Sequence, residues 1–259
     1  MIPTLPSKPG RLILGDLAVD PVTMSGALEA IERLVGARAG GLVVTPNVDH
    51  VVIAARNPAF RDVYAAADLS LADGMPIVLA SRLLSPRLPE KVSGSDLLDP
   101  LLERAAVHGW RVYFLGAGPG VAEEAAQRAR ERFGTTVAGV DAPFFRTPDE
   151  PAARTAAERA AASGADLVLL AFGAPKQELF GHLYRRTLAP AVSVGIGASL
   201  DFLAGRVRRA PRWISRTGLE WLWRLVREPR RLWRRYLVDD PRFLVILWRT
   251  LRNRRRLPG

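Results

Sequence analysis

The sequence predicts a doubly wound α/β fold, in which helices cover both faces of a mostly parallel sheet. Short apolar runs of the kind found in buried strands alternate with stretches whose apolar residues recur at helical spacing. Several of these runs end in Gly, Thr, Asn or Asp, as strands do that lead into helices. Apolar residues make up 48% of the 259 residues, so the chain can bury a substantial core.

The first part of the chain provides short strands and the helices between them. Residues 11–20 predict one or two strands, and residues 24–36 predict a helix because their apolar residues recur at helical spacing. The next predicted elements are strands at 41–44 and 68–72 and helices at 49–57, 59–67, 75–84 and 96–107, the last capped by Ser95. This alternation is typical of the β-α-β units of a parallel sheet.

The second part of the chain repeats the alternation. The predicted elements are strands at 110–115, 135–140, 166–171 and 191–194 and helices at 121–133, 150–163 and 176–186. We expect one Rossmann-like body, or two lobes whose weakest connection is the proline-containing stretch 85–92.

Asp73 follows the predicted strand 68–72 and precedes Gly74-Met75-Pro76, a turn that can start a helix. Open α/β folds bind ligands outside the carboxyl ends of their strands, which favours a catalytic carboxylate here. An Asp before a helix with Pro in its first turn is also a common N-cap, and for the residue taken alone this is the more frequent case.

A glycine turn follows the strand 110–115. Gly116 and Gly118 lie between that strand and a helix, where backbone N–H groups can hold a diphosphate. The full dinucleotide motif would have a third glycine where this chain has Val121. An NAD-dependent oxidoreductase is therefore only a weak alternative.

Other strand ends carry further polar or small residues. Lys176 and Gln177 begin the helix 176–186, where a lysine is electrostatically unfavourable unless an anionic ligand is present or the side chain is solvated. Gly197 follows the strand 191–194 and allows either a ligand or a packed chain to approach closely, and Thr45 and Asn47 follow the strand 41–44. Together with Asp73, these strand ends predict an active site for a phosphorylated substrate.

The composition excludes several kinds of site. There are no cysteines, so disulfides, thiolate nucleophiles and cysteine metal sites are excluded. The three histidines, His50, His108 and His182, are too scattered to suggest a metal cluster, and we expect no metal and no cofactor. Residues 1–10 contain three prolines and no apolar core segment, so we expect no secretory signal and a cytoplasmic protein.

Basic charge is concentrated at the C-terminal end. The chain has a net charge of +11, and residues 206–259 hold 17 arginines against four acidic residues, which leaves residues 1–205 at −2. The same segment holds five of the six tryptophans. We therefore predict an α/β catalytic domain at 1–205 and a basic helical appendage at 206–259.

The appendage has three possible roles. Arginine with tryptophan can bind nucleic acid through phosphates and base stacking, or an anionic membrane surface through headgroups and interfacial side chains. The third possibility is a helical subdomain packed on the body. Residues 243–248 are far shorter than the ~20 apolar residues of a membrane-spanning helix, so they cannot cross a bilayer.

Several motifs, in order, resemble the WecG/TagA/CpsF glycosyltransferase family over about residues 12–236. They are Thr45-Pro46-Asn47, Ala72-Asp73-Gly74-Met75-Pro76, Gly94-Ser95-Asp96, Phe114-Leu115-Gly116, Gly173-x-Pro175-Lys176-Gln177-Glu178, Gly195-x-Gly197-Ala198, Arg209-Ala210-Pro211 and Gly218-Leu219-Glu220-Trp221. The chain departs from the usual pattern by continuing past Tyr236 into an arginine-rich end, from which we expect extra membrane affinity.

The resemblance implies an inverting transfer of an N-acetylmannosamine-type sugar from a UDP-sugar to a polyprenyl-diphosphate-linked acceptor, at the inner face of the cell membrane. It implies that Asp73 is the general base, that Thr45 helps to place substrate, and that Gln177 lies at the active site. It also implies that a basic appendage supplies arginines to the donor diphosphate and attaches the protein to the membrane.

The expected substrate-binding residues are Asn47, Gly74, Ser95, Gly116, Gly118, Lys176, Gln177, Gly197, Arg209, Arg216 and Arg224. The three arginines are candidates for neutralising the leaving diphosphate, because the turns lack an Asp-x-Asp metal motif. The expected partners are the UDP-sugar, the polyprenyl-linked acceptor and an anionic membrane, and a homo-oligomer is compatible. A nucleic-acid-binding α/β protein is the alternative from another class.

Overall fold

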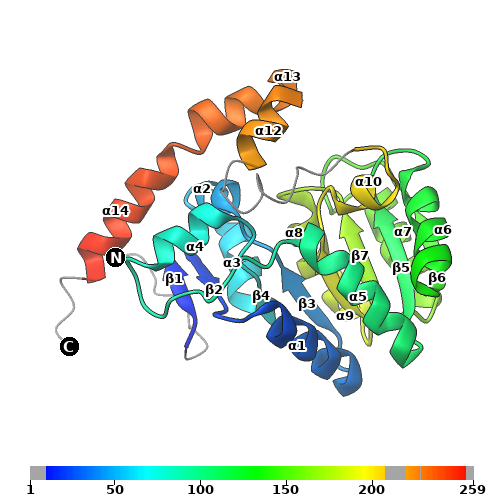
Figure 1. Cartoon of the computed structure of the whole chain (residues 1–259). Coiled ribbons are helices and arrows are strands. Elements are labelled where there is room, and N and C mark those ends of the chain that lie inside the picture. Colours follow the sequence, from blue (N-terminus) through cyan, green and yellow to red (C-terminus); the bar gives the residue numbers. More distant parts are fainter. Residues whose placement is uncertain (1–9, 208–219, 228, 255–259) are drawn as a thin grey trace.

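The computed structural model describes residues 10–207, 220–227 and 229–254 (Figure 1). Within these residues, a six-stranded parallel sheet runs in the order β4-β3-β8-β7-β5-β6. Its strands are β3 (Gly41–Val44), β4 (Leu69–Ser70), β5 (Arg111–Gly116), β6 (Thr136–Asp141), β7 (Leu167–Ala171) and β8 (Val192–Gly195). The predicted α/β class with a parallel sheet is confirmed.

Helices cover both faces of this sheet, so the fold is doubly wound. One face packs against α1 (Met24–Ala37), α5 (Gly94–His108), α6 (Val121–Phe133) and α10 (Ser199–Leu203). The other face packs against α2 (Val48–Ala54), α3 (Pro58–Ala66), α4 (Met75–Ser81), α7 (Pro151–Ala162), α8 (Lys176–Leu183) and α9 (Arg185–Leu188). A hairpin of β1 (Leu12–Leu14) and β2 (Leu17–Val19) packs on this second face.

Local sequence explains where several helices begin and end. The side chains of Thr23, Asn57 and Ser93 accept hydrogen bonds from backbone N–H groups in the first turns of α1, α3 and α5. Gly109 and Gly134 end α5 and α6 in the left-handed conformation, which glycine adopts without a steric cost. These caps satisfy backbone groups that would otherwise lack partners at the helix ends.

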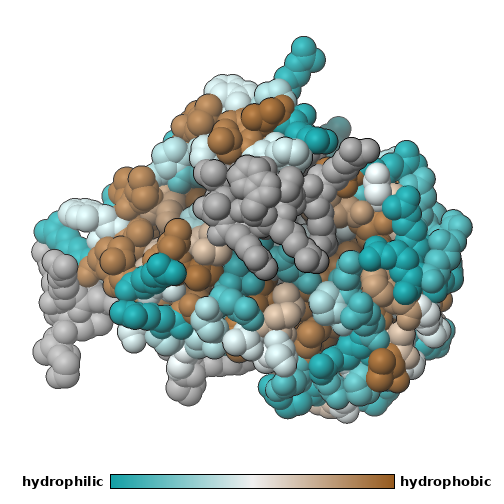
Figure 2. All heavy atoms as spheres, in the orientation of Figure 1, coloured by the Kyte–Doolittle hydropathy of each residue, from teal (hydrophilic) through white to brown (hydrophobic). Residues whose placement is uncertain are grey.

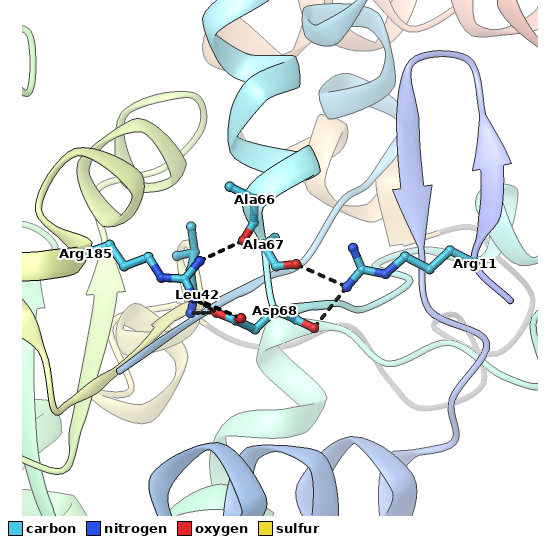
Figure 3. A network of polar contacts seen from close by, with 6 residues as sticks. All are labelled: Arg11, Leu42, Ala66, Ala67, Asp68 and Arg185. Atoms are coloured by element: carbon cyan, nitrogen blue, oxygen red, sulfur yellow. Dashed lines mark hydrogen bonds and ion pairs between the residues drawn. The ribbon is translucent and has the colours of Figure 1, made fainter. Parts of the chain in front are cut away.

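The start of β4 is held by a partly buried polar network around Asp68 (Figure 3). The Asp68 carboxylate accepts from the Leu42 backbone N–H at 2.8 Å and from the Arg185 guanidinium at 2.9 Å. Arg11, itself buried, donates to the carbonyl oxygens of Ala67 and Asp68 at 3.2 and 2.9 Å. The network joins the hairpin, α3, α9 and the sheet at the opposite end of β4 from Asp73.

The C-terminal segment is helical where the structure describes it. Its elements are α12 (Glu220–Arg227), α13 (Pro229–Arg234), the π-helix η1 (Arg235–Asp239) and α14 (Arg242–Arg254). In Figure 1 they form an arm along one side of the body, and α14 packs on α2 and β1. Phe243 is buried against the second core face, and the backbone N–H of Gly15 donates to the Thr250 hydroxyl at 3.1 Å.

Four details differ from the sequence predictions. The strand predicted at 68–72 is only two residues long, and the helix predicted at 176–186 is divided into α8 and α9. The residue that caps α5 is Ser93, so the prediction that Ser95 caps a helix beginning at Asp96 was wrong. The six strands form one sheet, in which β8 lies between β3 and β7, so residues 85–92 do not separate two sheets.

Candidate active site

The carboxyl ends of β4, β3 and β8 are joined by hydrogen bonds. The backbone N–H of Asp73, which follows β4, donates to the carbonyl oxygen of Pro46, which follows β3, at 2.8 Å. The buried hydroxyl of Thr45 donates to the carbonyl oxygen of Gly195, at the end of β8, at 3.0 Å. Three adjacent strand ends, two of which carry predicted catalytic residues, therefore form one connected edge.

The topology makes this edge a natural place for a ligand. After β8 the chain continues into α10 on one face of the sheet, whereas β3 and β7 on either side lead into α2 and α8 on the other face. Connections that leave neighbouring strands in opposite directions open crevices outside the carboxyl ends of those strands. The end of β8 thus lies at a topological switch point, next to Thr45.

Asp73 does not occupy the N-cap position of the helix that follows it. That position belongs to Gly74, whose φ of 127° is a conformation that glycine adopts readily and other residues rarely do. The side chain of Asp73 is partly buried, and its negative charge raises the pKa of Tyr64 in α3. Burial, followed by the carboxylates of Glu178 and Asp73, holds the pKa of Tyr64 well above its ordinary value.

Asn47 and Gly197 shape turns at the same edge, each through a hydrogen bond between a side-chain oxygen and a backbone N–H. The side-chain oxygen of Asn47 accepts from the His50 N–H at 3.4 Å and caps α2. Gly197 has a φ of 55°, and its N–H donates to the side-chain oxygen of Gln177 at 3.0 Å. Asn47 therefore shapes the turn after β3, and Gly197 shapes the turn after β8.

Gln177 and Glu178 are both buried in the first turn of α8. The Gln177 amide nitrogen donates to Glu178 Oε1 at 2.7 Å, and Glu178 Oε2 has no hydrogen-bond partner among the described residues. Burial raises the pKa of Glu178 from 4.5 to about 7, against the lowering effect of the hydrogen bonds from Gln177 and from the backbone. The negative charge of Asp49 adds to the rise.

Lys176 has a protein partner. Its ammonium donates to the carbonyl oxygen of Phe145 at 3.1 Å and lies 5.3 Å from the centre of the Phe145 ring. These contacts offset the unfavourable position of a lysine at the start of a helix. They are an alternative to the anionic ligand that the sequence suggested.

The glycine turn after β5 is explained largely by packing. At Gly116, which has a φ of 107°, an added Cβ would lie 2.9 Å from the backbone of Ala171. Helix α6 then begins with Glu123 and Glu124 in its first turn, and Arg206 Nε donates to Glu124 at 2.8 Å. These carboxylates complement the positive end of the helix dipole, so the turn gives little support to a dinucleotide site.

Gly118 and Ser95 lie close to this edge of the sheet but in different turns. Among the described residues, a Cβ on Gly118 would meet only Val121, at 3.6 Å. The Ser95 hydroxyl lies 3.1 Å from the Ser93 hydroxyl at the start of α5. Beside it, Gly94 allows α5 to approach the end of β8, because a Cβ there would lie 3.1 Å from Ile196.

The position of the three predicted tail arginines relative to the site stays a prediction. Arg209 and Arg216 lie outside the described residues, and of Arg224 only its position in α12 is described. In the described parts of the chain, no group of three or more His, Asp or Glu residues is arranged to hold a metal ion.

Sequence reasoning missed Glu178, His50 and Tyr64 as parts of the site region. His50 Nδ1 lies 2.6 Å from the Tyr64 hydroxyl, and both side chains are buried. Glu178 stands within the motif that identified Gln177, but periodicity and charge do not distinguish a buried glutamate from a solvated one in the first turn of a helix. The contact with the Gln177 amide is visible only in three dimensions.

The fold and the candidate site thus define a doubly wound α/β protein with polar groups at a switch point of its sheet. Residues 12–257 match the model of the glycosyl transferase WecG/TagA/CpsF family. The chain belongs to this family and is a glycosyltransferase, which confirms the resemblance seen in the motifs.

One curated relative is an N-acetylglucosaminyldiphosphoundecaprenol N-acetyl-beta-D-mannosaminyltransferase from Bacillus spizizenii. It is 38% identical over 207 residues, which cover 80% of this chain and 78% of the relative. The aligned length includes most of the chain, so the likeness is not confined to one motif.

None of the helices in the described parts of the chain combines the length and apolar character needed to span a bilayer.

Proposed function

We propose that this glycosyltransferase transfers an N-acetylmannosamine-type sugar from a UDP-sugar to a polyprenyl-diphosphate-linked sugar, with inversion at the anomeric carbon. The 38% identity to a transferase whose name specifies a mannosaminyl group and a diphosphoundecaprenol acceptor carries the proposal. Such a reaction would belong to the synthesis of a bacterial cell-surface polysaccharide or teichoic acid.

Asp73 is the proposed general base. The acceptor hydroxyl oxygen attacks the anomeric carbon, its proton passes to the Asp73 carboxylate, and the bond to the UDP oxygen breaks with its electron pair leaving on the diphosphate. Support comes from the position of Asp73 outside β4, hydrogen bonded through its backbone to the turn after β3. The N-cap position of α4, the main alternative for an Asp at this place, is occupied by Gly74.

Thr45, which follows β3, and Gln177, in the first turn of α8, are proposed to place the substrate at the same edge of the sheet. In the free protein the Thr45 hydroxyl donates to Gly195, and the Gln177 amide holds Gly197 and Glu178. The Thr45 oxygen can still accept a hydrogen bond, and the Gln177 nitrogen retains a second N–H. Asn47, Gly74, Ser95, Gly116, Gly118, Lys176 and Gly197 complete the proposed substrate-binding set.

The appendage at 206–259 is proposed to bind an anionic membrane at its inner face and to bring arginines to the donor diphosphate. Leu244 and Trp248 on α14 are 67% and 56% exposed, although Phe243 beside them is buried. Arg249 and Arg252 are exposed on the same helix, and apolar residues gather along the α12 to α14 side of the molecule in Figure 2. Apolar and basic side chains on one surface suit an interface with anionic lipid.

The experiment is a product assay with the full chain. It is incubated with a panel of UDP-linked N-acetylhexosamines and a polyprenyl-diphosphate N-acetylglucosamine acceptor, and the lipid product is weighed by mass spectrometry. We expect an increase of one N-acetylhexosamine with the manno donor and little with the gluco and galacto donors. No lipid product with the manno donor, or tight salt-sensitive DNA binding with no transfer, would contradict the proposal.

A further inference from the structure

Glu178 is a buried carboxylate with no obvious stabilising role. It is 1% exposed, and one of its two oxygens has no hydrogen-bond partner among the described residues. A buried carboxylate with an unsatisfied oxygen costs free energy, and an apolar side chain of similar size often replaces such a group without loss of stability. A reason for a glutamate at this position therefore has to come from what its other oxygen does.

The other oxygen fixes the orientation of the Gln177 amide. Glu178 Oε1 receives the Gln177 nitrogen at 2.7 Å, and the Gln177 oxygen receives the backbone N–H of Gly197 at 3.0 Å. The backbone N–H of Gly197 can only donate, so a rotated amide would face it with an NH2 group and lose that contact. A rotated amide would also turn its oxygen toward Glu178, where an ionised carboxylate offers no donor. The pair of partners thus selects one of the two amide orientations.

The oriented amide supports the turn after β8, which we call the β8 turn and define as Gly195, Ile196 and Gly197. The Gln177 nitrogen lies 3.0 Å from where a Cβ on Gly195 would stand, so the amide rests directly on the backbone there. On the other side, Thr45 donates to the carbonyl oxygen of Gly195. The β8 turn is therefore held between Thr45 and the Gln177 amide, and through Pro46 the hydrogen bonds continue to Asp73.

We infer that Glu178 is a positioning residue, which holds the Gln177 amide so that the β8 turn lies at the correct distance from Thr45 and Asp73. It acts through Gln177 and does not touch the substrate. The link to turnover rests on the proposed function, whereas the link to the position of the β8 turn does not.

The first test measures how well the β8 turn is protected from amide hydrogen exchange, and it needs no substrate. Amide hydrogen exchange is followed in the peptide containing Gly197 for the wild type, Glu178→Leu and Glu178→Gln. Exchange of Gly197 should be about tenfold faster in Glu178→Leu, because the amide that accepts its N–H is no longer oriented. It should stay close to wild type in Glu178→Gln, whose side-chain oxygen can still accept from Gln177.

Two further variants complete this test. His182→Leu is the control for an apolar replacement on α8 and should leave Gly197 exchange unchanged, because the buried His182 Nδ1 has no hydrogen-bond partner in the described parts of the chain. Glu178→Ala serves if Glu178→Leu does not fold. Unchanged exchange of Gly197 in Glu178→Leu, or in Glu178→Ala where that variant is used, would overturn the inference, whatever reaction the protein catalyses.

The second test is a double-mutant cycle on kcat with Gln177→Leu and Glu178→Leu. Each single variant should lower kcat by about 10- to 100-fold, since small displacements in an active site have effects of this size. The double variant should be no slower than Gln177→Leu alone, because Glu178 acts through Gln177. Additive losses, or a Glu178→Gln variant as slow as Glu178→Leu, would show that Glu178 does not work through the amide.

Discussion

Replacement of Asp73 by Asn should lower kcat by about 10²- to 10⁴-fold, the usual range for loss of a general base. Asparagine has nearly the same shape but cannot take the proton of the acceptor hydroxyl. The backbone hydrogen bond from residue 73 to Pro46 does not depend on the side chain, so the turn should keep its position. The dissociation constant of the UDP-sugar, measured by calorimetry, should therefore change by less than about threefold.

Asp62→Asn is the matched control for this experiment. Asp62 is an exposed carboxylate on α3, the helix that also carries Tyr64, and its loss should leave kcat unchanged. Near-normal turnover by Asp73→Asn would remove Asp73 from the role of base. Loss of UDP-sugar binding together with turnover would instead place Asp73 in donor binding.

Replacing Leu244 and Trp248 by Ser should weaken binding to anionic vesicles by about 10²-fold, because two large apolar side chains no longer enter the lipid interface. Both side chains are more than half exposed, so the fold should be retained. Activity on an acceptor embedded in vesicles should fall with binding, and activity on a water-soluble short-chain acceptor should stay close to wild type. Vesicle flotation and the two product assays measure these effects.

Truncation after Gly205 is a less specific version of the same test. It would also remove Phe243 from the core on the second sheet face and the contact of Thr250 with Gly15. The control for the surface variant is Val107→Ser, which changes an apolar residue that is 84% exposed on α5, far along the chain from the appendage. If the Leu244 and Trp248 variant binds vesicles as tightly as Val107→Ser does, membrane attachment through α14 is contradicted.

Most of the fold could be predicted from the sequence because most strands of its sheet are buried; the exception is β6, whose residues are exposed or partly exposed. Buried parallel strands appear as continuous apolar runs, and the strands predicted at 166–171 and 191–194 correspond to β7 and β8. The length of β4 was overestimated, since residues 71 and 72 remain buried after pairing with β3 has ended. The order of the strands, with β8 placed between β3 and β7, depends on packing between distant segments that periodicity does not encode.

The candidate site was predictable to the level of the strand ends and no further. Thr45 and Asp73 were placed at one edge because each follows a strand, and the structure joins their turns. From helix electrostatics, Lys176 was expected to bind an anionic ligand. Its contact with the distant Phe145 carbonyl is not visible in the sequence. The same holds for the contact between Gln177 and Gly197, which are 20 residues apart.

The anomeric configuration of the transferred sugar tests the central claim most directly. If Asp73 acts as a base on the acceptor hydroxyl and does not itself attack the sugar, the acceptor displaces UDP directly, so an α-linked UDP-sugar should give a β-linked product. The measurement is the one-bond carbon-hydrogen coupling at the anomeric carbon of the purified product, read by NMR. A β-linked product is the predicted result, and an α-linked product would contradict the assignment of Asp73 as the base of an inverting transfer.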